Sequence, residues 1–258
     1  SPRGILTVPA GGFEAVLRET CGDWLADAGT LCLVSGMAGS RQGWREAPYC
    51  ACPAGFSEVA ARLEWITPGR IALVPGLSCE AAGVPDVMRG EEVQVFGAME
   101  LLRLSDGTFV LPGTHSKWVE VREGRIVSFA TYMSGETYAL LRQHSILART
   151  LPAEEPPLDE AAFTRGVRHA QAAGSLLHSA FSARTLALFD RMPAEGLASY
   201  LSGLVIGEEL RARGRADTAV VLVGSPALCT RYRLALQATA REARSLGSEA
   251  TWRGLWAI

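Results

Sequence analysis

Hydrophobic residues recur along the chain in two patterns, one typical of helices and the other of buried strands. Helical spacing covers several segments of the sequence, namely 12–28, 91–102, 135–148, 160–171, 176–189, 195–213 and 226–240. Short apolar runs predict strands at 31–34, 71–74, 108–111, 118–121, 125–129 and 219–223. Because strands and helices alternate, the sequence predicts an α/β protein with a partly parallel sheet.

The pattern changes near Asp86, and this change predicts two domains. Residues 1–86 hold a helix, two buried strands and a loop at 36–54 that is too long for a simple turn. Loops of that length in compact domains are usually functional. Residues 87–258 contain strands joined by the hairpin signal Arg122-Glu123-Gly124, followed by several helices. We therefore expect a domain boundary after residue 86.

Composition argues against several classes of protein. The chain has 258 residues, 48% of them hydrophobic, and can bury a large core. A net charge of −2 without basic runs argues against nucleic acid as a partner. No apolar run reaches about 18 residues, so no membrane partner is expected. Scattered cysteines without zinc spacing fit free thiols in a reducing cytoplasm: Cys21, Cys32, Cys50, Cys52, Cys79 and Cys229.

Three glycine-containing segments could carry chemistry. In residues 88–92 (MRGEE) two carboxylates follow Gly90 and open a helix, although acidic residues suit any helix N-terminus. In residues 111–118 (LPGTHSKW) a strand enters a Gly-Thr turn that can hold phosphate oxygens, although a simple hairpin has the same pattern. In residues 221–226 (VLVGSP) a strand breaks at Gly224 and a helix follows, which suits either a nucleotide site or an ordinary α/β connection.

The loop at 39–49 (GSRQGWREAPY) places arginine, glutamine and tryptophan side chains between glycines. Arginine pairs with carboxylates through two parallel hydrogen bonds, and tryptophan can pack on a sugar face. The loop therefore suits a carboxylated, hydroxylated small molecule, or else it is a surface loop with an arginine stacked on the tryptophan. Neither HExxH nor GxSxG occurs, so zinc-hydrolase and serine-hydrolase chemistry has no starting point.

The order of these segments resembles the 2-dehydro-3-deoxygalactonokinase family. The resemblance spans about residues 11–232 and is most specific in MRGEE and PGTHSKW. The matching segments are GSRQGW and EAPY at 39–49, MRGEE-Q-FGA at 88–98, LPGTHSKWV at 111–119, MSGE-YALL--HS-L at 133–147, SGLVIGEEL at 202–210 and VGSPALCTRY at 223–232. The resemblance implies the two-domain, actin-like ATPase (ribonuclease H-like) sugar-kinase fold. It also implies ATP and Mg²⁺ as cofactors, and transfer of phosphate to the 6-hydroxyl of 2-dehydro-3-deoxy-D-galactonate.

The resemblance also implies roles for particular residues. Glu91 matches the catalytic base, which is Asp in the wider superfamily, and Glu92 is the alternate. Four residues fit the sugar acid: Arg41, Gln42, Trp44 and Arg89. Six residues fit the phosphates and adenosine of ATP: Gly113, Thr114, Ser116, Lys117, Gly224 and Ser225. His115 lies between Thr114 and Ser116 and continues the same turn.

The family's first phosphate motif, Asp-x-Gly-[Thr/Ser], is not found in this sequence. We therefore assign no metal ligand and expect domain one to lack its N-terminal strand pair, with very weak or no kinase activity if the chain begins at Ser1. Two other functions remain open: a non-catalytic sugar-acid-binding protein, and a kinase for the epimeric 2-keto-3-deoxygluconate. The sequence leaves a homodimer open as well.

Overall fold

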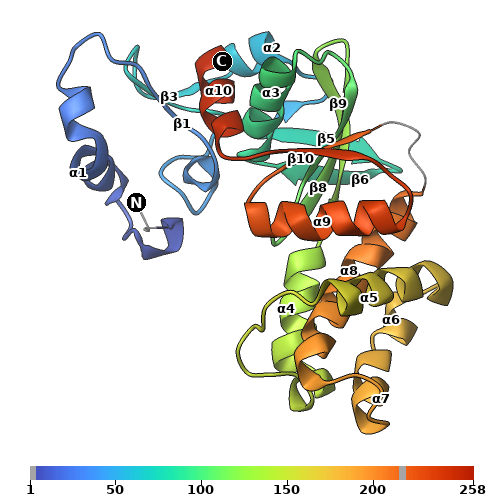
Figure 1. Cartoon of the computed structure of the whole chain (residues 1–258). Helices are drawn as coiled ribbons and strands as arrows, with labels where there is room; N and C mark the ends of the chain where they lie inside the picture. Colours follow the sequence, from blue (N-terminus) through green and yellow to red (C-terminus); the bar gives the residue numbers. More distant parts are fainter. Residues whose placement is uncertain (1–3, 215–218) are drawn as a thin grey trace. The chain divides into compact units, whose positions relative to one another are not determined.

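A computed structural model describes residues 4–214 and 219–258, which form two compact units (Figure 1). The first unit contains the chain up to Asp106, together with 119–130 and 248–258. The second unit contains 107–118 and 131–247. The chain passes between them within β8 (Ser116–Arg122) and β9 (Arg125–Tyr132). The units are thus discontinuous along the chain, and the boundary after residue 86 stays a prediction from the sequence.

The described residues of the first unit form two small sheets and four α-helices, in addition to most of β8 and β9. Its helices are α1 (Phe13–Leu25), α2 (Phe56–Ala60), α3 (Glu91–Leu102) and α10 (Glu249–Ala257), with short 3-10 helices at Ile5–Thr7 and Met37–Gly39. Its strands are β1 (Cys32–Val34), β2 (Cys50–Ala51), β3 (Glu64–Thr67), β4 (Ile71–Leu73), β5 (Leu77–Ala81) and β6 (Val84–Met88). One sheet has the order β1-β4-β3 and the other β2-β5-β6. In each, one pair is parallel and one antiparallel.

Helix α3 packs against α10, the C-terminal helix, which lies about 150 residues further along the chain (Figure 1). Glycines make this close approach feasible. A Cβ on Gly97 would lie 1.7 Å from the Ala250 carbonyl oxygen, and one on Gly254 would lie 1.8 Å from the Val93 carbonyl oxygen. The C-terminal helix therefore holds α3, at whose N-terminus the MRGEE segment lies.

The second unit builds on a sheet with the strand order β11-β10-β7-β8-β9. Besides the ends of β8 and β9 that belong to it, its strands are β7 (Gly107–Leu111), β10 (Val220–Val223) and β11 (Ala243–Leu246). Strand β10 runs parallel to both β7 and β11. The helices are α4 (Ser134–His144), α5 (Glu160–Ala173), α6 (Leu176–Ser179), α7 (Ser182–Leu188), α8 (Ala194–Arg213) and α9 (Pro226–Ala238), with a 3-10 helix at Ile146–Arg149.

Two apolar cores hold the second unit together. In the first, side chains of β7, β8 and β10 pack with α5, α8 and α9, for example Trp118, Phe163 and Leu222. In the second, α8 packs with α5, α7 and the 3-10 helix, for example through Leu201 and Leu147. Burial of this apolar surface is the main force that fixes α8 beside the sheet.

Most elements lie where the sequence predicts them, and the mixed α/β class with parallel strand pairs is confirmed. One difference is the helix expected at 176–189, which breaks into α6 and α7. The Ser182 hydroxyl donates to the Ser179 carbonyl, and the Ala183 N–H bonds to Ala180 instead. A side chain that competes for a helical carbonyl explains the break. In the described part of the chain, no helix is long and apolar enough to cross a membrane.

Candidate active site

The MRGEE segment lies where α3 begins, against the loop that follows β1. Gly90 has φ +106°, a conformation that favours glycine, and a Cβ there would lie 3.1 Å from the Gly36 Cα. The chain therefore turns sharply at Gly90 and places both following carboxylates in the first turn of α3. We call Tyr49, Arg89, Glu91 and Glu92 the Arg89 cluster.

The two carboxylates of the Arg89 cluster have different surroundings. Glu91 is partly exposed, and its Oε2 accepts the Arg89 N–H at 2.9 Å. Glu92 is fully buried, and both of its carboxylate oxygens accept the Gly90 N–H, at 2.9 and 2.7 Å. Burial raises the pKa of Glu92 to about 8. Glu91 can therefore meet a substrate, whereas Glu92 is enclosed by protein.

Arg89 is only 8% exposed, which is unusual for a charged side chain. Its Nη2 donates to the Ala47 carbonyl at 2.8 Å, and its guanidinium lies 4.4 Å from the centre of the Tyr49 ring. Its Nε and Nη1 are buried and have no hydrogen-bond partner among the described residues. A buried cation with unused donors can hold an anion such as a carboxylate.

The backbone of the loop after β1 lies close to Arg89, but the loop side chains expected to bind substrate either pair elsewhere or are exposed. A Cβ on Gly39 would lie 3.1 Å from Arg89 Nη1, so the loop backbone passes close to the guanidinium. Arg41 is an exposed residue paired with Glu46 at 2.9 Å, and Gln42 is exposed as well. Trp44 stacks on Phe13 with ring centres 6.5 Å apart. The structure thus brings the loop backbone to Arg89, while Arg41 and Trp44 pair within the protein.

In the second unit, the Gly113-Thr114 turn meets the N-terminus of α4. A Cβ on Gly135 would lie 2.4 Å from the Gly113 carbonyl oxygen, and the Glu136 N–H donates to the Thr114 carbonyl at 3.0 Å. His115 Nε2 lies 2.6 Å from Glu136 Oε2. The turn therefore lies directly against the N-terminus of α4, and glycine turns and helix N-termini are favourable settings for phosphate.

Gly224 and Ser225 lie at the start of α9, as the sequence predicts. A Cβ on Gly224 would lie 3.6 Å from Pro112, so the break after β10 adjoins the end of β7. The Ser225 Oγ accepts the Leu228 N–H at 3.5 Å, and Pro226 follows as the first helical residue. The structure thus brings together the Gly-Thr turn and the Gly-Ser break.

Ser116 and Lys117 follow the turn but lie inside the protein. Ser116 is fully buried and its hydroxyl donates to Glu209 at 2.8 Å. Lys117 is 6% exposed, and its Nζ donates to the Thr131 hydroxyl at 2.7 Å. Both side chains are therefore buried next to the turn and already hydrogen-bonded to other side chains.

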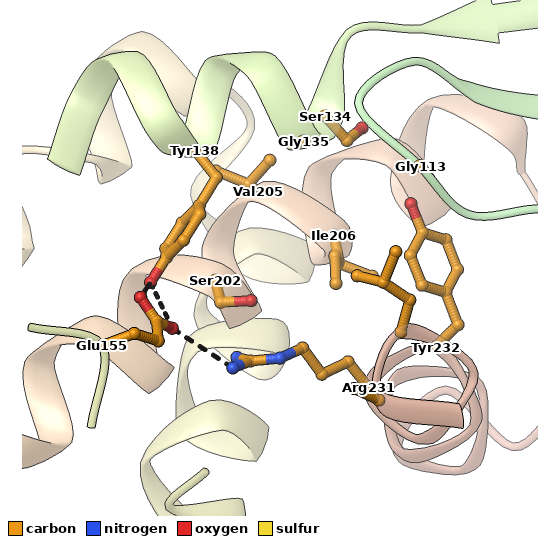
Figure 2. A pocket seen from close by; sticks show the side chains of 12 residues that line it. Gly113, Ser134, Gly135, Tyr138, Glu155, Ser202, Val205, Ile206, Arg231 and Tyr232 are labelled. Atoms are coloured by element: carbon orange, nitrogen blue, oxygen red, sulfur yellow. Dashed lines mark hydrogen bonds and ion pairs between the residues drawn. The ribbon is translucent and has the colours of Figure 1, made fainter. Parts of the chain in front are cut away.

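A cavity of about 280 Å³ opens beside the turn, and we call it the Gly113 cavity (Figure 2). Its walls come from the turn, α4, α8 and α9, and include Gly113, Gly135, Ser202, Ile206, Leu228 and Arg231. Figure 2 shows Tyr138, Glu155 and Arg231 joined at the end away from Gly113. The Tyr138 hydroxyl lies 2.9 Å from both Glu155 oxygens, and Arg231 Nη2 lies 3.2 Å from Oε1.

The sequence analysis assigns no role to Glu155, Tyr138 or Arg231, although Tyr138 and Arg231 lie within two of the matching segments. Glu155 lies in a Pro/Glu-rich connection that has no motif, and only the fold brings it to Tyr138 on α4. Arg142 completes the set with Nε 3.0 Å from Glu155 Oε2. Burial raises the pKa of Tyr138, and its bond to Glu155 adds to this, so the phenol remains a donor.

Glu209 on α8 is a further functional candidate, and it is only 2% exposed. Its carboxylate accepts from Trp118 Nε1 at 2.6 Å, Tyr232 OH at 2.7 Å, and the hydroxyls of Ser116 and Ser134. Burial raises the pKa of Glu209, whereas the four donors favour its charged form. The one sequence signal is an acidic pair inside the otherwise apolar segment SGLVIGEEL.

Among residues 4–214 and 219–258, no three His, Cys, Asp or Glu side chains are grouped closely enough to hold a metal ion. Magnesium in kinases is commonly held by one or two carboxylates together with the phosphates of the nucleotide. A protein-made metal cage is therefore not required for such chemistry, and no metal ligand is assigned.

Comparison with known proteins agrees with this picture. A family model described as 2-keto-3-deoxy-galactonokinase matches residues 1–258. The chain is 36% identical to the 2-dehydro-3-deoxygalactonokinase of Escherichia coli K12, over 92% of this chain and 80% of that protein. It is 35% identical to "Probable 2-dehydro-3-deoxygalactonokinase DgoK1" of Rhizobium meliloti 1021, over 100% of this chain and 89% of that protein.

A solved structure is similar as well. It is a crystal structure from Sinorhizobium meliloti, of a protein provisionally assigned as a 2-dehydro-3-deoxygalactonokinase. It matches with a TM-score of 0.90 at 35% identity, covering 100% of this chain and 88% of that one. The fold and these relatives define the class of the protein as a sugar-acid kinase, a phosphotransferase. More particularly, the chain belongs to the 2-keto-3-deoxy-galactonokinase family.

Proposed function

We propose that the protein transfers the γ-phosphoryl group of ATP to the 6-hydroxyl of 2-dehydro-3-deoxy-D-galactonate. The product is 2-dehydro-3-deoxy-6-phosphogalactonate, and the fold is the two-domain, actin-like sugar-kinase fold. The names of the relatives support the substrate. ATP enters as its magnesium complex, so that the metal accompanies the nucleotide.

The Arg89 cluster is our site for the sugar acid, and the buried guanidinium of Arg89 is the observation that carries the proposal. An unpaired charge in a buried position costs several kcal/mol. A substrate carboxylate would use the free Nε and Nη1 donors and offset that cost. Arg41, Gln42 and Trp44 belong to the same loop and stay proposed contacts for the sugar hydroxyls.

Glu91 is our general base. A base must approach the hydroxyl to within hydrogen-bond distance, and Glu91 is partly exposed whereas Glu92 is fully buried. The hydroxyl oxygen attacks the γ-phosphorus, the bond between the γ-phosphorus and the β–γ bridging oxygen breaks, and ADP leaves with the bonding electron pair. The hydroxyl proton passes to the Glu91 carboxylate.

The Gly113 cavity is our site for ATP. Backbone N–H groups of the Gly113-Thr114 turn and of the α4 N-terminus suit the phosphates. Gly224 and Ser225, where α9 begins, suit the adenosine. Ser116 and Lys117 support the turn through their side chains, since these are buried and already hydrogen-bonded within the protein. Positioning and charge neutralisation are the main tasks of a protein in phosphoryl transfer.

The first experiment measures ADP release with Mg²⁺ and ATP, comparing 2-dehydro-3-deoxy-D-galactonate with its gluconate epimer. We expect release that depends on the sugar acid and a higher kcat/KM for the galactonate. A preference for the gluconate epimer would overturn the substrate assignment. Binding of the sugar acid without ADP release would instead leave a sugar-acid-binding protein.

Arg89→Ala tests the sugar-acid site. Loss of a charge-assisted bond of about 1.5–3 kcal/mol should raise the KM for the sugar acid roughly 10- to 100-fold, with little change in the KM for ATP. Arg18→Ala is the control, because Arg18 is an exposed residue of α1 paired with nearby Glu14. An unchanged KM for the sugar acid in Arg89→Ala would remove Arg89 from the site.

Glu91→Gln tests the base. The amide keeps the size of the side chain but cannot take the proton, so kcat should fall about 10²- to 10⁴-fold while ATP affinity stays the same. Glu100→Gln is the matched control, since Glu100 is an exposed carboxylate of the same helix. Near-normal turnover in Glu91→Gln would exclude Glu91 as the base.

A further inference from the structure

One buried carboxylate on α8 is bonded to β8, α4 and α9 around the Gly113 cavity. Glu209 lies on α8 and is 2% exposed. Its Oε1 accepts from Ser116 and Trp118, and its Oε2 accepts from Ser134 and Tyr232. A carboxylate has about four acceptor positions, so this one is fully used. Such complete satisfaction makes a buried charge tolerable and its surroundings rigid.

The four donors come from three segments that matter for ATP. Ser116 and Trp118 belong to β8, directly after the Gly113-Thr114 turn. Ser134 is the first residue of α4, and Tyr232 lies on α9, after the Gly224-Ser225 break. Ser134 and Tyr232 also line the Gly113 cavity, and Figure 2 shows both near Gly113.

We propose that Glu209 is the positioning residue of the ATP site: it fixes the phosphate turn, the α4 N-terminus and α9 relative to one another without touching the nucleotide. The inference rests on the proposed function of the Gly113 cavity. It explains why an otherwise apolar stretch of α8 contains a carboxylate. It also gives Ser116 a role as a donor to Glu209.

The geometry separates the effect of shape from the effect of charge. The Trp118 N–H can only donate, so a glutamine at position 209 must keep its oxygen toward Trp118 and Ser116. Its amide nitrogen would then donate to the Ser134 and Tyr232 oxygens, because hydroxyls can accept as well as donate. Glu209→Gln can therefore retain all four bonds, whereas Glu209→Leu loses them all.

The test uses the full chain and two measurements. Steady-state kinetics give kcat and the KM values for ATP and the sugar acid, and calorimetry gives the affinity for a non-hydrolysable ATP analogue. For Glu209→Leu we expect kcat/KM for ATP to fall on the order of 100-fold, the cost of misplacing a site by about 1 Å. Sugar-acid affinity should stay within about twofold, because the Arg89 cluster makes none of these bonds.

Two further variants complete the design. Glu209→Gln should stay within about threefold of the wild type in all constants, since its bonds are retained. Tyr232→Phe removes one donor and keeps the ring, so it tests the proposal even if Glu209→Leu does not fold; we expect a rise of about threefold to tenfold in the KM for ATP. Glu208→Gln is the matched control, because Glu208 pairs with Arg211 on the same helix.

Three results would overturn the inference. They are unchanged ATP binding in folded Glu209→Leu or Tyr232→Phe, equal loss of ATP and sugar-acid binding, and a Glu209→Gln variant as impaired as Glu209→Leu. Failure of the wild type to bind the ATP analogue is a different outcome. It would refute the proposed function of the cavity itself.

Discussion

Gly135→Ala should damage the proposed ATP site by pushing two backbone segments apart. Gly135 is the second residue of α4 and faces the Gly113-Thr114 turn. An added Cβ would lie 2.4 Å from the Gly113 carbonyl oxygen and 2.8 Å from the Thr114 Cα. Both neighbours are backbone atoms, so no side-chain rotation can relieve the collision.

The structure gives the size of the effect. Ordinary contact begins at 3.4 Å, so the turn and the helix must separate by about 1 Å, the difference from 2.4 Å. That shift would stretch the Glu136 N–H bond to the Thr114 carbonyl beyond its present 3.0 Å. Overpacking costs about 1–3 kcal/mol of stability, and a site misplaced by about 1 Å loses roughly 100-fold in rate.

The assay combines urea unfolding with the kinetics of ADP release. We expect kcat/KM for ATP to fall on the order of 100-fold, with the KM for the sugar acid unchanged. Gly22→Ala is the control, because it lies in α1 and its new Cβ would meet nothing within 4 Å. It should gain up to about 1 kcal/mol of helix stability without altering kinetics. Normal ATP kinetics in folded Gly135→Ala would refute the contact on which this reasoning depends.

The remaining predictions concern stability. The folded pKa of Glu92, about 8, lies above its ordinary value of 4.5, so the native state holds the proton more tightly and stability falls as pH rises from 4.5 to 8. Urea unfolding of Glu92→Gln should lack this fall, and parallel curves for variant and wild type would contradict it. Gly90→Ala should lower the free energy of unfolding in urea by about 1–3 kcal/mol, because Gly90 has φ +106° and the added Cβ would lie 3.1 Å from the Gly36 Cα. An unchanged free energy of unfolding would contradict the strain. Asp159→Ala should cost about 0.5–2 kcal/mol by removing the cap on the Ala162 N–H at 2.9 Å, and it should leave the KM for ATP unchanged.

Local signals explain which elements could be predicted. The α3 helix begins at Glu91 and ends at Leu102 as expected, since Gly90 marks its start. The sequence does not predict the β5–β6 hairpin. In the structure its turn residues Ala82 and Gly83 both have positive φ, as in a two-residue hairpin turn. Its flanking strands are half exposed and carry too little apolar alternation to be recognised.

Elements stabilised from a distance were missed for another reason. Strand β11 pairs with β10, and α10 packs on α3, so neighbours far away in sequence decide their structure. Short segments of that kind have little intrinsic preference, because tertiary packing supplies most of the stability of a short helix or strand.

The sequence by itself determined the mixed α/β class and most of the helices and strands, because glycine turns and helix starts depend on local backbone preference. The order of its motifs was enough to indicate the family. The sequence could not separate Glu91 from Glu92, since only burial distinguishes them. Nor could it join Glu209 to Ser116, Ser134 and Tyr232, or Glu155 to Tyr138. Those side chains are far apart along the chain, and packing of α8 and α9 against the sheet is what brings their donors and acceptors within hydrogen-bond distance.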